Sequence, residues 1–416
     1  MGVSSGGSLG RRFGWLWAAY AVSTYGSSFC FGALPLIAIT VLHAGATEVS
    51  ALAASGLAVG ALVAVPLGPW VEFRRKRPVM IAMDLSRFVV LASIPAAFAL
   101  GLLSFAQLLI VSVVTAAADI TFRSASGAYL KTFVPREELL VANARFEATT
   151  WSAQVIGPPL GGAAMGLFGP VVTVLADAVS YLLSAVGIGA IGDSEPRSTR
   201  HRASRVRVNE VLDGWRCILG HRGLRAMMAN SVLFNGLLLA AEPPLAVLLV
   251  GQLGFAPWQY GLAFALPCLG GLVGARAARP LATRFGHHRV LIAAAILRTC
   301  WPLGLAFVGP GIPGLMLVIV VEFGLIVCIG VANPLIATYR LHQTPADRVT
   351  RTLSAWTITA KATTAALTGL WGLLAAATSP RVAIAVSGAL LLATPLLLPR
   401  HEHLAPSAPE PATEPA

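Results

Sequence analysis

The stretch Gly68–Arg87, GPWVEFRRKRPVMIAMDLSR, recurs in the second half of the chain as Arg279–Arg298, RPLATRFGHHRVLIAAAILR. The two copies align without a gap, and the alignment pairs Arg87 with Arg298. In each copy a basic turn leads into an apolar run. Self-similarity at a fixed offset is typical of a duplicated structural unit. The repeat therefore predicts a chain built from two related halves, each with a basic turn after its second apolar segment.

The composition points to a membrane rather than to water as the main solvent. The 416-residue chain is 56% hydrophobic and 12% charged, whereas soluble domains carry about 25% charged residues. A net charge of +12 would suggest a nucleic-acid partner in a soluble protein. Here the basic residues stand in short clusters between apolar runs, the arrangement that orients membrane proteins. We therefore expect membrane lipid, and no nucleic acid, around this chain.

The apolar runs predict an all-α membrane protein with twelve transmembrane helices in two pseudo-symmetric six-helix bundles. About 20 apolar residues are needed to cross the hydrocarbon core as a helix. Runs of this kind occupy residues 14–40, 49–71, 79–101, 105–126, 146–168, 170–192, 226–250, 257–279, 289–309, 313–337, 355–377 and 380–398.

The basic clusters predict the orientation and the domain boundaries. They follow the even-numbered runs, and Lys and Arg are nearly missing from the odd-numbered connections. Because positive loops stay in the cytoplasm, both termini are expected there. The predicted domains are an N-terminal bundle, a basic cytoplasmic linker, a C-terminal bundle and a disordered cytoplasmic tail rich in Pro, Ala and Glu, at residues 1–192, 193–225, 226–398 and 399–416.

The stretch VIGPPLGG, Val155–Gly162, places Pro158 and Pro159 inside an apolar run. Proline has no N–H for the helical ladder, so the helix can bend there. Gly157 and Gly161 are four residues apart and clear one helix face for a neighbouring backbone. Together with Gly162 they predict a hinge beside a close packing surface. Static close packing without a mechanical role is the alternative.

Ionisable residues inside predicted spans mark functional sites by default, because their burial in a membrane is costly. Glu242 is followed by two prolines, which predicts a broken helix beside an acid. Glu322 lies near the middle of its run. Either carboxyl group is a candidate for binding a proton or the substrate. Arg298 lies at a depth where it could neutralise Glu322, which would make the two a structural pair.

Two further groups complete the set of candidate residues. Tyr25 and Phe29 are one helical turn apart and could line an apolar cavity, although the sequence favours core packing, since aromatic stripes are common. Asp84 and Arg87 are three residues apart and can meet on one helix face. We expect them to form a structural pair that is coupled to the loop around Glu72.

These features resemble the major facilitator superfamily over nearly the whole chain, and within it the drug and siderophore exporters of the transmembrane secretion effector type, which include macrolide efflux proteins. The fifth run matches the exporter motif G-P-x-x-G-G at Gly157, Pro158, Gly161 and Gly162. The turn after the second run resembles the family's gating loop, with Glu72 where the family has Asp and Phe73 where it has Arg. The resemblance assigns that loop to Gly68, Glu72, Arg74, Arg75, Lys76 and Arg77, with Asp84 and Arg87 behind it.

The resemblance implies proton-coupled export of a small lipophilic or amphipathic molecule from a bacterial cytoplasmic membrane. An uptake carrier on the same fold is the main alternative, because a fold does not set direction. A membrane enzyme or a non-transporting sensor is a further one. No G-x-x-x-x-G-K-[ST] loop is present, which argues against direct use of ATP. We expect a monomer that needs neither a cofactor nor a metal and is not an enzyme.

Overall fold

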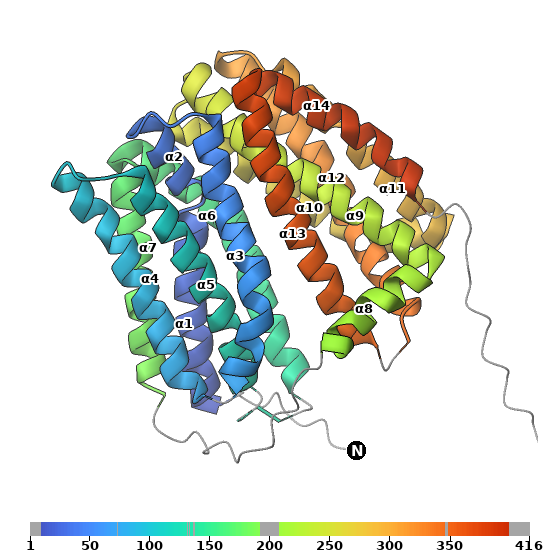
Figure 1. Cartoon of the computed structure of the whole chain (residues 1–416), viewed down its shortest axis with the longest axis horizontal. Coiled ribbons are helices and arrows are strands. Elements are labelled where there is room, and N and C mark those ends of the chain that lie inside the picture. The colour runs from blue at the N-terminus through green and yellow to red at the C-terminus, as the bar shows by residue number, and fades with distance from the viewer. Residues whose placement is uncertain are drawn as a thin grey trace, which may run out of the picture.

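The computed structural model describes residues 10–191 and 208–398, apart from 73, 131, 133, 136–137 and 346–347. Every regular element in this part is a helix (Figure 1). The first half contains α1 (Gly10–Phe29), α2 (Ala33–Thr40), α3 (Ala46–Glu72), α4 (Lys76–Ala99), α5 (Phe105–Leu130), α6 (Leu139–Phe168) and α7 (Pro170–Gly189). The predicted tail 399–416 and residues 193–207 of the predicted linker lie outside the described residues.

The second half begins with the short helix α8 inside the predicted linker. Nine further helical segments follow it in the described chain. In chain order the elements are α8 (Val208–Gly220), α9 (Arg222–Ala246), the π-helix η1 (Val247–Gln252), α10 (Pro257–Phe285), α11 (His287–Cys300), the 3₁₀-helix η2 (Pro302–Phe307), α12 (Gly311–His342), α13 (Val349–Ala377), α14 (Pro380–Ala393) and the 3₁₀-helix η3 (Thr394–Leu397).

Nine helical segments of the described chain are long and apolar enough to cross a membrane. They are α1 with α2, α4, α5, α7, α9 with η1, α10, α11 with η2, α12, and α14 with η3. The chain is therefore a multi-pass membrane protein. The other three predicted runs, 49–71, 146–168 and 355–377, lie on α3, α6 and α13. The count of twelve spans stays a prediction.

Two predicted segments have a different local structure from the one expected. The first run is divided between α1 and α2, and the turn between them places Gly32 at a φ of 77°, which favours glycine. By contrast, the predicted break at Pro243 and Pro244 was wrong, because α9 remains helical through both residues and continues into η1. A helix keeps most backbone groups hydrogen-bonded within the segment, and a membrane penalises any other arrangement.

The contacts between helices in the second half repeat those in the first. In the first half α1 packs on α6 and α7, α4 packs on α5 and α7, and α3 packs on α5. In the second half α9 packs on α13 and α14, α11 packs on α12 and α14, and α10 packs on α12. The largest contacts between the halves join α3 to α13 and α6 to α10 (Figure 1). Each pairing has its counterpart at the position that the sequence repeat predicts.

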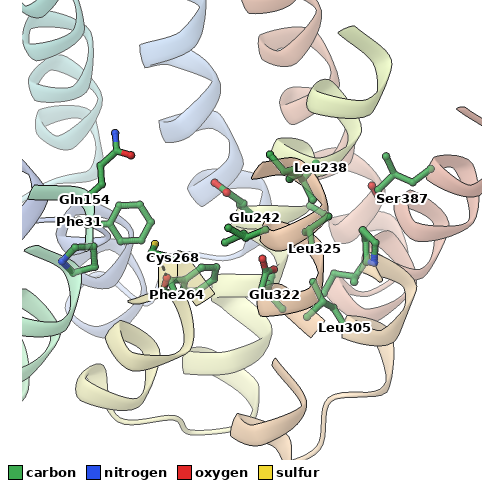
Figure 2. A pocket seen from close by; sticks show the side chains of 18 of the residues that line it. Phe31, Gln154, Leu238, Glu242, Phe264, Cys268, Leu305, Glu322, Leu325 and Ser387 are labelled. Atoms are coloured by element: carbon green, nitrogen blue, oxygen red, sulfur yellow. Dashed lines mark hydrogen bonds between the residues drawn. The ribbon is translucent and has the colours of Figure 1, made fainter. Parts of the chain in front are cut away.

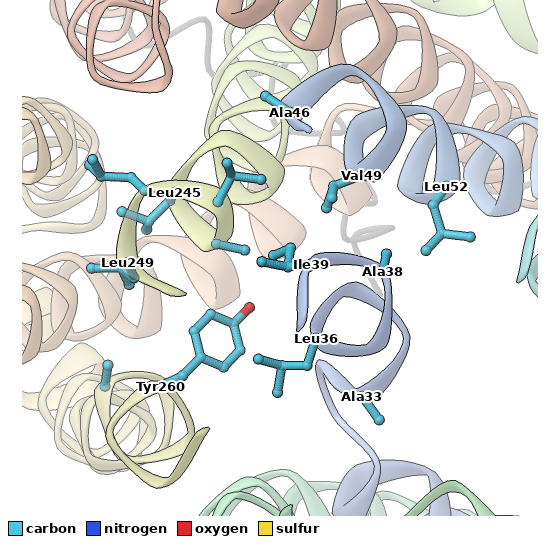
Figure 3. Close-up of a cluster of buried hydrophobic side chains, with 14 of the residues drawn as sticks. Ala33, Leu36, Ala38, Ile39, Ala46, Val49, Leu52, Leu245, Leu249 and Tyr260 are labelled. Carbon is cyan, nitrogen blue, oxygen red and sulfur yellow. The ribbon is translucent and has the colours of Figure 1, made fainter. Parts of the chain in front are cut away.

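The buried apolar side chains form three clusters. One, the shared cluster, draws on both halves and includes α2 and η1, with Leu36, Ile39, Leu249 and Tyr260 among its members (Figure 3). A second cluster around Phe13 contains residues of the first half alone. The third contains residues of the second half alone, such as Leu224, Leu291 and Trp356. The two halves thus share one core at the end of the molecule that holds α2, and have separate cores at the other end.

Candidate functional site

Glu242 on α9 and Glu322 on α12 line the same cavity, whose volume is about 460 Å³. Helices of both halves contribute to its wall, since Gln154 of α6 and Phe31 also line it. Figure 2 shows the two carboxyl groups projecting into one space. Gln154 and Phe31 lie on one side of that space, and Ser387 of α14 lies on the other. The structure therefore brings together two acids that are far apart in the sequence.

The cavity offers these acids an apolar environment without a counter-charge. Most of the lining side chains are apolar, with Phe264, Leu238 and Leu325 beside the acids. Within the described residues, neither carboxyl group has an ion pair, and no basic side chain lines the cavity. An ionised carboxylate in such surroundings is costly unless it is paired. A proton or a positively charged ligand is therefore what this site can take up.

Arg298 does not take part in this site, so the expected pairing with Glu322 does not form. Its guanidinium Nη2 donates to Asn230 Oδ1 at 2.8 Å, and its Cζ lies 3.8 Å from the centre of the Phe234 ring. Arg298 lines a different cavity, whose wall does not include Glu322. The sequence indicated that Arg298 is buried in the membrane, but it could not indicate which neighbouring helix the side chain contacts.

The aromatic candidates of α1 also lie outside the cavity wall. Tyr25 Oη donates to Ser152 Oγ of α6 at 2.8 Å, and Phe29 is half-buried at the end of α1. The wall is lined instead by Ser27, Ser28 and Phe31. Helical periodicity placed both residues on α1 but could not give the rotation of that helix, which turns Ser27 and Ser28 toward the cavity instead.

Sequence reasoning missed Gln154 as a wall residue, although a signal was present. A polar amide in an apolar run, one turn before Pro158 on the same helix, is the pattern of a residue facing a cavity. Pro158 itself lines the cavity. Nothing comparable marked Phe264 or Cys268, because apolar and weakly polar residues occur on every face of a membrane helix.

The glycines around Pro158 lie where α6 meets two other helices. A Cβ at Gly157 would lie 2.6 Å from the backbone carbonyl carbon of Ser28 on α1, and one at Gly162 would lie 2.7 Å from the Cα of Gly261 on α10. The helix itself continues through Pro158 and Pro159. The motif therefore allows two backbones, one from each half, to approach the same helix beside the cavity.

We expect Gly161→Ala to destabilise the folded protein. Its Cβ would overlap the carbonyl oxygen of Phe29, a backbone atom that cannot move aside alone. Overpacking of this kind costs about 1–3 kcal/mol, so the thermal midpoint of the purified protein in detergent should fall. The control is Gly127→Ala in α5, where no neighbouring atom lies within 4 Å of the new Cβ. Equal midpoints for the two variants would contradict the close contact.

The basic turn connects α3 and α4 and reaches the end of α7. Arg77 donates from Nε to the carbonyl of Ile188 at 3.0 Å and from Nη2 to that of Gly189. A cation at a helix C-terminus satisfies carbonyls that lack an intrahelical partner. Lys76 Nζ donates to the carbonyl of Arg74 at 2.8 Å. The side chain of Glu72 and the surroundings of Gly68 lie outside the described part.

Asp84 and Arg87 form a buried ion pair that joins three helices. Asp84 is 0% exposed and accepts from Arg87 Nη2 and, at 2.7 Å, from Ser184 Oγ on α7. Arg87 also lies 3.6 Å from Asp119 Oδ1 on α5, and its Cζ lies 4.2 Å from the centre of the Tyr181 ring. The predicted pairing is present, and its partners tie α4 to α5 and α7.

The family can be assigned now that the fold and the cavity are described. A family model described as Major Facilitator Superfamily matches residues 16–360 and 243–415. The chain belongs to the major facilitator superfamily. Because members of this superfamily are membrane transporters, the chain is a transporter of small molecules rather than an enzyme. A search of curated proteins returns no match.

Several solved structures share this fold over nearly the whole length of the chain. A bacterial homologue of the iron transporter ferroportin in an inward-facing state has 17% identity and a TM-score of 0.76, and the match covers 94% of this chain and 98% of that one. The nucleoside transporter NupG has 10% identity, a TM-score of 0.70, and coverage of 92% and 98%. A bacterial homologue of the human lysosomal transporter Spinster has 13% identity, a TM-score of 0.66, and coverage of 94% and 95%. At these identities the likeness concerns the fold alone.

Proposed function

We propose that this superfamily member is a proton-coupled exporter of a small amphipathic molecule with a positive charge. In this proposal twelve spans form two six-helix bundles that alternate access to a central site. Both termini lie in the cytoplasm of a bacterium, and the protein works as a monomer. The assignment to the efflux type is supported by the Gly157–Gly162 motif and the basic loop after the second span, both of which resemble those of exporters.

The observation that supports this function best is the pair of acids without a counter-charge in an apolar cavity between the two halves. A cationic group can pair with Glu242 and Glu322, while its apolar body packs on side chains such as Phe31, Phe264 and Leu325. Protons can occupy the same two carboxyl groups when the cation has left. Because a desolvated carboxylate needs one occupant or the other, the cation and the protons exclude each other, and this competition is the basis of exchange.

The three apolar clusters support alternating access. The shared cluster packs the halves together at the end that holds α2 and η1. The basic turn with Arg74, Arg75, Lys76 and Arg77 lies at the opposite end of α3, where each half has a core of its own. Because basic loops lie in the cytoplasm, the described state is closed to the outside. Opening it requires the shared cluster to part, with the packing of α6 on α1 and α10 as the hinge.

Inside-out vesicles with an acid interior and a pH-sensitive dye test this function. We expect tetraphenylphosphonium or a quaternary ammonium detergent to release protons from vesicles that contain the protein, and not from vesicles without it. Erythromycin serves as a larger amphipathic cation. Transport of the cation without any proton movement would contradict the coupling. Protein-dependent accumulation of the cation in whole cells would contradict the direction.

A further inference from the structure

A second cavity lies within the second half, apart from the acidic one. Its volume is about 210 Å³, and it shares no lining residue with the cavity of Glu242. Its described wall contains two arginines, a hydroxyl group and two amides, together with apolar residues, and no acid among these residues. Its residues on α9, α11, α12 and α13 are Ser231, Asn235, Arg298, Asn333, Ile336, Ala337, Arg340 and Trp356.

The sequence repeat shows why a positive charge is left over in this cavity. Arg87 and Arg298 occupy equivalent positions of the two copies and are 3% and 1% exposed. In the first half Asp84 and Asp119 neutralise Arg87. The position equivalent to Asp84 is Ala295 in the second copy. The second half has therefore kept the buried cation and lost its acid.

Among the described residues, no acidic side chain pairs with Arg298 or Arg340. Arg298 donates through Nη2 to the neutral Asn230, whose own amide donates to the carbonyl of Thr394. The Nε atoms of Arg298 and Arg340 and the Oγ of Ser231 are buried without a hydrogen-bond partner. Buried charges are normally paired, because an unpaired charge loses its hydration without compensation. Two guanidinium groups with unused donors at one cavity call for an anion.

We propose that this cavity binds an anion that presents a carboxylate or phosphate group. The planar guanidinium fork matches the oxygens of such groups, and the Ser231 hydroxyl and the amides of Asn235 and Asn333 can complete the shell. The indole of Trp356 already holds Arg340, whose Cζ lies 5.0 Å from the ring. The anion is either free in solution or the headgroup of an anionic lipid. This site does not depend on the exporter function proposed above.

Equilibrium dialysis of the purified full-length chain in neutral detergent with radiolabelled inorganic phosphate, at constant ionic strength, tests the site. We expect saturable binding near one phosphate per chain and at least a tenfold loss of affinity in Arg340→Gln. The control Arg289→Gln removes the same charge from an exposed position of α11 and should keep the wild-type affinity. Absence of saturable binding by the wild type, or equal affinity in Arg340→Gln, overturns the proposal.

A second variant and a lipid arm complete the experiment. Asn333→Leu removes one amide of the cavity and leaves both Arg298 and Arg340 in place. We expect it to cause a smaller but measurable loss of phosphate affinity, which tests the site even if Arg340→Gln folds poorly. Phosphate binding is then compared in nanodiscs of phosphatidylcholine with and without phosphatidylglycerol. Competition by phosphatidylglycerol identifies a lipid headgroup as the ligand, and unchanged phosphate affinity identifies a free anion. Wild-type affinity in both variants contradicts the site whichever lipid is present.

Discussion

Replacing Glu242 with glutamine is expected to abolish the proposed proton-coupled cation transport and to leave the protein folded. Glutamine keeps the size of the side chain but cannot exchange a proton or attract a cation. Removal of one partner from a desolvated charge pair costs about 2–5 kcal/mol, and about 1.4 kcal/mol corresponds to a factor of ten. We therefore expect cation binding to weaken by about 30-fold or more. Proton release from acid-interior vesicles is the measurement.

The control for this variant is Glu48→Gln, which removes the same charge from an exposed residue at the start of α3. Glu48 accepts from the Gly45 amide at 2.6 Å and lies outside the acidic cavity, so its loss should leave transport at the wild-type level. Thermal midpoints of all variants show whether they are folded. Full proton-coupled activity in Glu242→Gln would falsify the assignment and leave Glu322 as the remaining acid of the cavity.

The second large effect concerns stability. Asp84→Asn is expected to lower the free energy of unfolding by about 3–5 kcal/mol, the usual cost of removing one partner from a buried ion pair. The substitution leaves Arg87 buried and weakly paired, because Asp119 is half-exposed and already bonded to Arg123 Nε at 2.8 Å. The measurement is the unfolding midpoint of the purified protein in detergent with increasing denaturant.

A double variant shows whether the loss of stability comes from leaving Arg87 unpaired or from changing residue 84 itself. Asp84→Leu with Arg87→Met removes both charges, and such apolar replacements are often close to neutral, so it should be more stable than Asp84→Asn alone. The control is Asp213→Asn on α8, which breaks exposed contacts of 3.3 Å to Arg216 and to Arg351. Exposed pairs contribute about 0–1 kcal/mol. Similar losses for Asp84→Asn and Asp213→Asn would show that the Asp84 pair does not behave as a buried one.

Much of the fold was predictable from the sequence because hydrocarbon leaves the backbone so little freedom. Helices are the form in which a single segment satisfies its own hydrogen bonds there, so apolar runs of sufficient length map directly onto helices such as α4, α10 and α12. Glu242 and Glu322 were recognised for a related reason, since an acid in such a run is costly without a role. The pairing of Asp84 with Arg87 followed from their spacing on one helix.

Predictions about where a side chain points and which residue it contacts were weaker, because both depend on neighbouring helices. Tyr25 and Phe29 lie on the expected helix but outside the cavity wall, because the rotation of α1 turns Ser27 and Ser28 to the wall instead. The helix at Pro243 stayed continuous where local propensity predicted a break. Proline in a helix interior costs about 3 kcal/mol, and α9 accommodates two of them.

The sequence alone thus determined the membrane environment, the positions of the helices, the duplication and the two acids within apolar runs that are candidates for the site. These depend on local composition and on spacing along one helix. The folded chain determined that Glu242 and Glu322 share one cavity, that Arg298 turns to Asn230 and a second cavity, and that Gly162 meets Gly261 across the two halves. These contacts depend on the rotation and depth at which helices distant in the sequence pack against each other, and the hydropathy of a single helix carries no information about either.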